Sequence, residues 1–132
     1  MRYLLDTNIC IYLIKHHPPQ VRARFAGLSY GDVAISAITV AELEYGVAKS
    51  VHREKNAAAL QGFLLPLEVL SFDAAAGACY GALRADLERR GEVIGAMDML
   101  IAAQALAAGL VVVTNNVREF SRVLGLHCEN WI

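Results

Sequence analysis

Short runs of apolar residues alternate along the chain with longer segments in which apolar residues recur at helical spacing. The short runs predict strands at residues 3–5, 33–36, 69–71 and 111–114. The longer segments predict helices at residues 8–16, 21–26, 37–49, 53–65, 73–90 and 97–108. Strands that alternate with helices are typical of a parallel sheet covered by helices, so we predict an α/β fold.

The valine run at residues 111–113 lacks the polar alternation of a strand with one wet face. We therefore expect helices on both faces of the sheet, which is a three-layer α/β/α arrangement. Gly109 precedes this run, at a position where a glycine commonly ends a helix. The surrounding apolar stretch contains Asp98 and Gln104, so we do not predict a membrane span.

The composition is that of one folded domain. The 132 residues are enough for a core, and no linker or internal repeat divides them, so we predict a single domain over residues 1–132. Hydrophobic residues make up 56% of the chain and charged residues 19%, which excludes a disordered protein. The net charge of -1 means that a polyanion would have to be bound by local basic patches.

The cysteines and histidines form no recognisable metal or disulfide pattern. The three cysteines are widely spaced without a Cys-x-x-Cys pair, which fits a reducing cytoplasm. The four histidines never place two on one helical face, so we interpret them as surface or packing residues. The apolar run before Asp6 is too short for a signal peptide, and we expect a cytoplasmic protein.

Polar residues directly follow two of the predicted strands. They are Asp6-Thr7-Asn8 after the first strand and Thr114-Asn115-Asn116 after the fourth. In open α/β sheets, ligands bind beyond the carboxyl ends of the strands. Asp6 also precedes a predicted helix, so it can be a helix cap as well as a functional carboxylate.

Two further carboxylates lie on apolar helix faces. Glu42 shares a face with Ile38 and Tyr45, where an ionised group is costly unless it is paired, hydrogen-bonded or bound to a cation. A neutral glutamate or a pair with an arginine is the alternative. Asp98 opens the helix that contains Ile101, and alone it is explained as an N-cap or as a first-turn acid that interacts with the helix dipole.

Asp6, Glu42 and Asp98 together indicate a shared cation site, because no lysine or arginine stands at a matching buried position. Oxygen ligands suit Mg²⁺, with Mn²⁺ as a substitute. One or two such ions can activate water and stabilise the charge that develops when a phosphodiester is cleaved. We predict a metal-dependent nuclease in which these three residues are metal ligands and catalytic residues.

Other candidates surround this site. Asn116 can hold a metal-bound water or a phosphate, or it can form a capping box with Glu119 for a short helical turn. Glu119 can also contribute to the site directly. Thr7 and Thr114 can donate hydroxyl groups, although threonines beside helix starts are commonly structural.

These candidates stand in four segments that occur in order over nearly the whole chain. The segments are Leu5-Asp6-Thr7-Asn8, residues 38–46 around Glu42, residues 98–103 and Val113-Thr114-Asn115-Asn116 leading to Glu119-Phe120. As a set they resemble the PIN-domain toxins called VapC. The resemblance implies a PIN-like domain, an endoribonuclease that depends on Mg²⁺, a cognate VapB-type antitoxin and a homodimer. By position, it assigns Asp6, Glu42 and Asp98 to the family's acidic metal site.

Two departures and one subgroup feature refine the resemblance. The fourth acidic position of the wider PIN pattern is often Asp, whereas Asn116 stands here, which leaves occupancy of a second metal open. Residues 95–97 are Gly-Ala-Met where many relatives have a Pro or an aromatic residue, so RNA choice can differ. Residues 114–120 and 129–131 resemble the subgroup that cuts initiator tRNA in its anticodon stem-loop, which implies that substrate.

Eight basic residues are candidates for contacts with RNA phosphates, and the sequence singles out none of them. They are Lys49, Arg53, Lys55, Arg84, Arg89, Arg90, Arg118 and Arg122. Two alternative functions stay open at this point. One is a PIN nuclease that acts on another RNA or on DNA, and the other is a non-catalytic, partner-binding subunit of a repressor complex.

Overall fold

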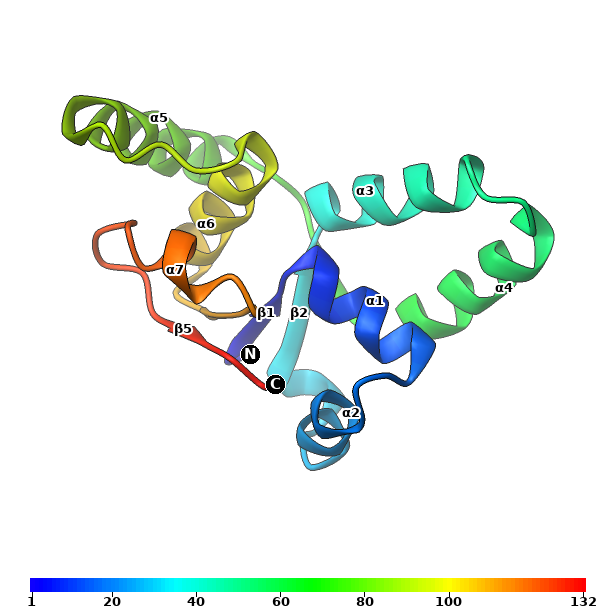
Figure 1. Cartoon of the computed structure of the whole chain (residues 1–132). Coiled ribbons are helices and arrows are strands. Elements are labelled where there is room, and N and C mark those ends of the chain that lie inside the picture. Colours follow the sequence, from blue (N-terminus) through cyan, green and yellow to red (C-terminus); the bar gives the residue numbers. More distant parts are fainter.

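Five short parallel strands form the centre of the fold in the computed structural model, which describes residues 1–132 (Figure 1). They are β1 (Tyr3–Leu5), β2 (Val33–Ser36), β3 (Glu68–Leu70), β4 (Val111–Val113) and β5 (Cys128–Glu129). Their order across the sheet is β3-β2-β1-β4-β5. From β1 the chain adds β2 and β3 toward one edge of the sheet, and β4 and β5 then lie toward the other edge. The strand order thus reverses between β1 and β4, and a ligand is expected beyond the carboxyl ends of these two strands.

Seven α-helices and one short 3-10 helix connect the strands. They are α1 (Thr7–Lys15), α2 (Pro19–Ala26), η1 (Tyr30–Asp32), α3 (Ala37–Ala48), α4 (Arg53–Leu64), α5 (Ala74–Arg90), α6 (Ala96–Ala108) and α7 (Val117–Phe120). In Figure 1, α5 and α6 lie on one side of the sheet, and α1 to α4 lie on the other.

Alternate side chains of the strands enter two separate apolar clusters. Leu4 and Val112 pack with residues of α5 and α6, and Phe120 of α7 joins them. Leu5 and Ile35 point to the opposite face, where they pack with residues of α1 to α4. The predicted three-layer arrangement is confirmed, because both faces of the sheet are covered.

The predicted elements agree with the observed ones to within two residues at each end. The largest difference is at α2, which begins at Pro19 because the fixed φ of proline suits the first position of a helix. Gly109 ends α6 with a φ of 68°, in the left-handed region that favours glycine, as predicted. The sequence pattern missed η1 and the two-residue strand β5. None of the helices combines the length and apolar character that a bilayer span requires.

Candidate active site

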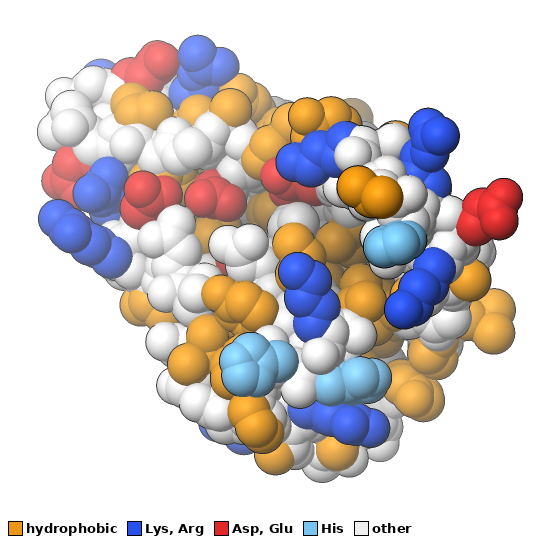
Figure 2. All heavy atoms as spheres, turned by 45° about the vertical axis from the view of Figure 1, so that its right-hand side comes forward, with side chains coloured by type: hydrophobic (Ala, Val, Ile, Leu, Met, Phe, Trp, Pro, Cys, Tyr) orange, Lys and Arg blue, Asp and Glu red, His pale blue; other side chains and the backbone are white.

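The acidic candidates gather beyond the carboxyl ends of β1 and β4. Asp6 directly follows β1, Glu42 lies in α3, and Asp98 lies in the first turn of α6. The charges of Asp6, Glu119 and Glu42 all act on the carboxyl group of Asp98. Figure 2 shows a row of acidic side chains across one face of the molecule, with basic side chains at both ends of the row. We call Asp6, Glu42, Asp98 and Glu119 the acidic pocket.

Asp6 is buried and uses its two oxygens differently. Its Oδ1 accepts a hydrogen bond of 2.9 Å from the backbone N–H of Ile9, which caps α1. Its Oδ2 accepts a hydrogen bond of 2.5 Å from the hydroxyl of Thr114, which is also buried. Burial raises the pKa of Asp6 and the charge of Glu42 adds to this effect, whereas the two hydrogen bonds lower it. Asp6 therefore caps α1 and also lies in the acidic pocket, while its functional role stays a prediction.

Glu42 is half-buried and is held by a hydroxyl group. The side chain of Thr7 donates to Glu42 Oε1 over 2.6 Å and lies 3.5 Å from the hydroxyl of Thr39. No lysine or arginine forms an ion pair with Glu42, so the alternative of a pair with an arginine is wrong. Thr7 and Thr114 thus each orient one carboxylate of the pocket.

Asp98 is the third residue of α6, while Gly95, which has no side chain to donate or accept, is the N-cap. Asp98 is therefore a first-turn acid and not a cap. Its pKa is raised to about 6, chiefly by burial and then by the negative charges of Asp6, Glu119 and Glu42. A hydrogen bond of 3.4 Å from Asn116 Nδ2 to Asp98 Oδ2 acts in the opposite direction.

The capping box between Asn116 and Glu119 is wrong. Asn116 is the N-cap of α7, but its side chain forms no capping hydrogen bond. Instead, Asn116 Nδ2 donates to Glu119 Oε2 over 2.9 Å and also reaches Asp98. The backbone N–H of Asn116 is satisfied by the hydroxyl of Thr114 at 2.8 Å. The amide of Asn116 therefore lies between two carboxylates, where it faces the pocket.

The acidic pocket lacks a countercharge. None of its four carboxylates forms an ion pair. As the side chains lie, no three acidic, histidine or cysteine groups stand close enough to hold a metal ion. The donor set consists of oxygens alone, which is the chemistry that fits Mg²⁺ or Mn²⁺.

The sequence analysis assigned a role to Asn116 but none to Asn115 or Gln104. Asn115 Nδ2 donates to the hydroxyl of Tyr12 over 2.9 Å, so its amide supports α1. Gln104 is buried in α6, where it accepts from Ser36 Oγ at 2.9 Å. A single glutamine inside an apolar helix was the available signal, because a buried amide needs hydrogen-bond partners.

Comparison with known proteins places this chain in a class. The model of the PIN domain matches residues 3–126. The chain is 47% identical over 131 residues to the tRNA(fMet)-specific endonuclease VapC of Shigella flexneri, covering 99% of this chain and 98% of that protein. It is also 44% identical over 132 residues to ribonuclease VapC2 of Haemophilus influenzae, covering 100% and 99% of the two chains.

A solved structure agrees with these relatives. The chain superposes with a TM-score of 0.94 on a chain of DNA-bound VapBC from Salmonella typhimurium, at 45% identity and with 100% and 99% of the two chains covered. The fold is thus that of a PIN domain. Within that class, the chain belongs to the VapC family of ribonucleases.

Proposed function

We propose that the chain is the toxin of a type II toxin–antitoxin pair and cuts initiator tRNA in its anticodon stem-loop, which stops translation. The observation that carries this proposal is the acidic pocket without a countercharge, at the point of the sheet where ligands are expected. The relative from Shigella flexneri, named for its action on tRNA(fMet), supports the choice of substrate.

Asp6, Glu42 and Asp98 would hold Mg²⁺, or Mn²⁺ in its place. When bound, such an ion supplies an activated water and neutralises charge on the phosphoryl and leaving oxygens. Thr7 and Thr114 keep the carboxylates of Glu42 and Asp6 oriented through their hydroxyl hydrogen bonds. These contacts limit the rotamers of both ligands, so less ordering remains to be done when a cation binds.

Asn116 and Glu119 have supporting roles in the same proposal. The amide of Asn116 donates to both Asp98 and Glu119, which fixes these two carboxylates relative to each other. An amide in place of a fourth acid lowers the negative charge of the pocket by one. This favours one bound ion over two.

A VapB-type antitoxin is the proposed partner. A groove of about 320 Å³ lies between α1, α3 and α4, with an apolar lining that includes Ile11, Ile14 and Leu60. Figure 2 shows a hollow with hydrophobic atoms at its floor beside the acidic row. An amphipathic segment of an antitoxin fits such a groove through spaced apolar anchors. The homodimer that the family resemblance implies belongs to the same proposal.

The first test is cleavage of total RNA by the purified protein, freed of any bound antitoxin, with Mg²⁺ or with EDTA. We expect discrete cuts in the anticodon stem-loop of initiator tRNA that require the metal. Three substitutions should each lower the rate of cleavage roughly a hundredfold or more: Asp6→Ala, Glu42→Gln and Asp98→Asn. Sequencing of the RNA ends locates the cut.

Glu44→Gln is the matched control, since Glu44 is an exposed acid of the same helix as Glu42. It should cleave like the wild type. Full activity of any one pocket variant would remove that residue from the mechanism. If the antitoxin-free protein cuts no RNA, the ribonuclease proposal fails and a role as a binding subunit takes its place. Cleavage that a single deoxyribose at the scissile position leaves unchanged would instead favour a nuclease without preference for RNA.

A further inference from the structure

The acidic pocket poses an electrostatic problem for an RNA substrate. A metal ion at the carboxylates can neutralise the reacting phosphate, but the neighbouring phosphates of the strand would still face four negative side chains. A polyanion is therefore bound productively only if basic groups stand beside the pocket. The net charge of the chain is -1, so these groups have to be local.

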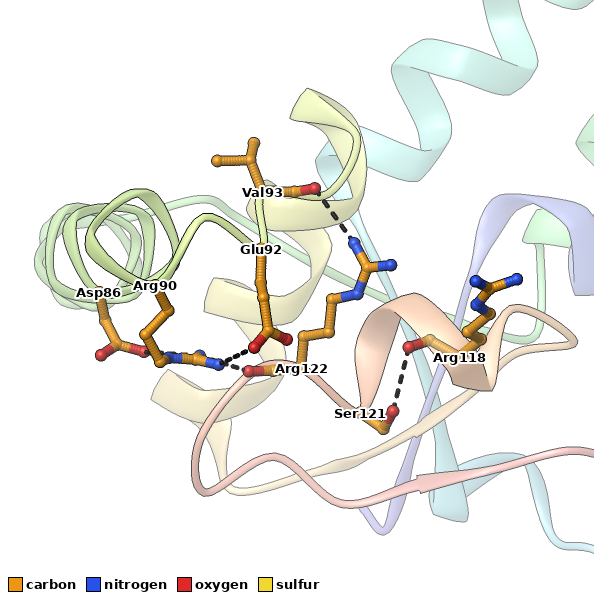
Figure 3. Close-up of polar contacts among 7 residues, drawn as sticks. All are labelled: Asp86, Arg90, Glu92, Val93, Arg118, Ser121 and Arg122. Atoms are coloured by element: carbon orange, nitrogen blue, oxygen red, sulfur yellow. Dashed lines mark hydrogen bonds and ion pairs between the residues drawn. The ribbon is translucent and has the colours of Figure 1, made fainter.

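Two arginines lie on the segment that also carries Asn116 and Glu119. Arg118 lies in α7, and Arg122 follows it by four residues in a turn that continues the helix. Hydrogen bonds from Ser121 N to Val117 O (2.8 Å) and from Arg122 N to Glu119 O (3.0 Å) maintain this continuation. Residues four apart are neighbours on one helix face. In Figure 3, both guanidinium groups project toward the same side of the segment, and that of Arg122 reaches the loop before α6.

The charges of these two arginines are not neutralised within the protein. Arg90, also drawn in Figure 3, pairs with Asp86 at 2.7 Å and with Glu92 at 3.4 Å. By contrast, neither Arg118 nor Arg122 forms an ion pair with a carboxylate. An arginine that already has two carboxylate partners offers little attraction to a phosphate, whereas one without a partner retains its full charge.

Arg122 is also held in position by neutral groups. Its Nη1 donates to the carbonyl of Val93 over 3.3 Å, which orients the guanidinium without cancelling its charge. The backbone carbonyl of Arg122 accepts a hydrogen bond of 2.6 Å from Arg90 Nη2. This bond ties the end of α5 to the turn after α7. An orientation that is fixed beforehand lowers the entropy that is lost when a ligand binds.

We propose that Arg118 and Arg122 bind backbone phosphates of the substrate RNA next to the scissile bond, while Arg90 holds their segment in place. The proposal rests on the proposed ribonuclease function and adds to it the residues that seat the strand. Arginine suits this role because its planar group donates two parallel hydrogen bonds to a phosphate. Phosphate contacts position the strand and carry no sequence information, so the effect should be similar for different RNAs.

The test compares Arg118→Gln, Arg122→Gln and the double variant with Arg22→Gln. Arg22 is a matched control because it is an exposed arginine of α2 without an ion pair. All are made in the Asp98→Asn protein, so that binding of the initiator-tRNA stem-loop is measured without cleavage. We expect each single change to weaken binding about tenfold. The association constant falls as the salt concentration rises, and in the double variant the slope of this log–log plot should be shallower by about 1.4. The variants keep the backbone bond between Arg122 and Arg90, and a melting curve checks their fold.

Three results would overturn the assignment. The first is a double variant whose affinity and salt slope equal those of the parent, and the second is an equal loss in Arg22→Gln. The third is a salt slope in Arg118→Lys and Arg122→Lys as low as in the glutamine variants, because lysine retains the charge that determines the slope even where it loses the paired hydrogen bonds. In active protein, the losses should appear in KM with kcat changed by less than about twofold. If the unsubstituted protein neither binds nor cuts RNA, the proposed function itself has failed, and this result is seen before any variant is made.

Discussion

At the scale of the residue, Asp98 makes the stability of the folded protein depend on pH. Its pKa lies at about 6 in the folded protein against an ordinary value of 3.8, because burial and three neighbouring acids disfavour the charged form. The folded chain therefore binds a proton more tightly than the unfolded chain does. The stabilisation from protonated Asp98 is fully present below pH 3.8 and is lost as the pH rises through 6.

We predict that the metal-free protein melts at a higher temperature at pH 5 than at pH 7.5. After allowance for solvent screening of this partly exposed group, the contribution of Asp98 is of the order of 1 kcal/mol, or about 3 °C. Asp98→Asn should reduce the slope of melting temperature against pH. The part of the slope that remains in this variant should come from Asp6, whose pKa is also raised. Melting curves in EDTA across this range measure both effects. An unchanged slope in Asp98→Asn would contradict the assigned shift.

The sequence predicted which polar residues gather at this site, because strand ends and helix faces follow from hydrophobic spacing. It did not predict how they bond. The second oxygen of Asp6 is held by Thr114, 108 positions away along the chain, and no local pattern indicates such a contact. Asn116 fitted a capping box locally, but the carboxylates of Asp98 and Glu119 are stronger acceptors for its amide. The catalytic roles of these residues stay predictions.

At the scale of the element, Gln104 joins the two helices that carry pocket residues. Ser36 Oγ accepts from Ile38 N at 3.0 Å at the start of α3, and it donates to Gln104 Oε1 in α6 at 2.9 Å. Gln104 Nε2 donates to the carbonyl of Ser71, just after β3, at 3.2 Å. Through this buried amide, the helix of Asp98 is fastened to the helix of Glu42 and to two strand ends.

We predict that Gln104→Leu lowers the free energy of unfolding by about 1–3 kcal/mol, because it leaves the hydroxyl of Ser36 and the carbonyl of Ser71 without their partner. Gln61→Leu is the control, since Gln61 is exposed on α4, and it should change stability by less than about 0.5 kcal/mol. Urea denaturation of the metal-free protein measures the difference. Equal stability of the two variants would show that the amide bonds contribute nothing net.

Elements with a clear hydrophobic period were predictable, and elements without one were not. The apolar faces of α1 and α6 and the valines of β4 determine their own class and approximate ends. In contrast, β5 has two residues, too few for any alternation to register, and it forms because β4 offers a free edge. Its neighbour Trp131 then packs against Tyr3 with ring centroids 5.4 Å apart, a contact set by the fold as a whole.

At the scale of the molecule, the groove between α1, α3 and α4 offers a way to separate antitoxin binding from catalysis. Gly46 lines this groove, and a Cβ at its position would meet no atom within 4 Å. We predict that Gly46→Leu fills space that the antitoxin needs. The affinity for the antitoxin should fall by about tenfold or more, while RNA cleavage continues.

Gly62→Leu is the control for this change. Gly62 lies in α4 with equally open space around its Cβ but does not line the groove. It should bind a VapB-type antitoxin like the wild type. Titration calorimetry with the antitoxin gives the affinities, and cleavage of RNA by each free variant gives the activity. Wild-type affinity in Gly46→Leu would place the antitoxin elsewhere on the surface. The homodimer and the cytoplasmic location stay predictions.

Glu42 belongs to two sites at once, since it lines the groove and its charge acts on both Asp6 and Asp98. Any groove ligand that contacts this carboxylate alters the attraction of the pocket for a cation. Reciprocity then requires that a cation in the pocket change the affinity of the groove by the same factor. The affinity of the toxin for its antitoxin would then depend on the concentration of Mg²⁺, through one side chain that both sites share.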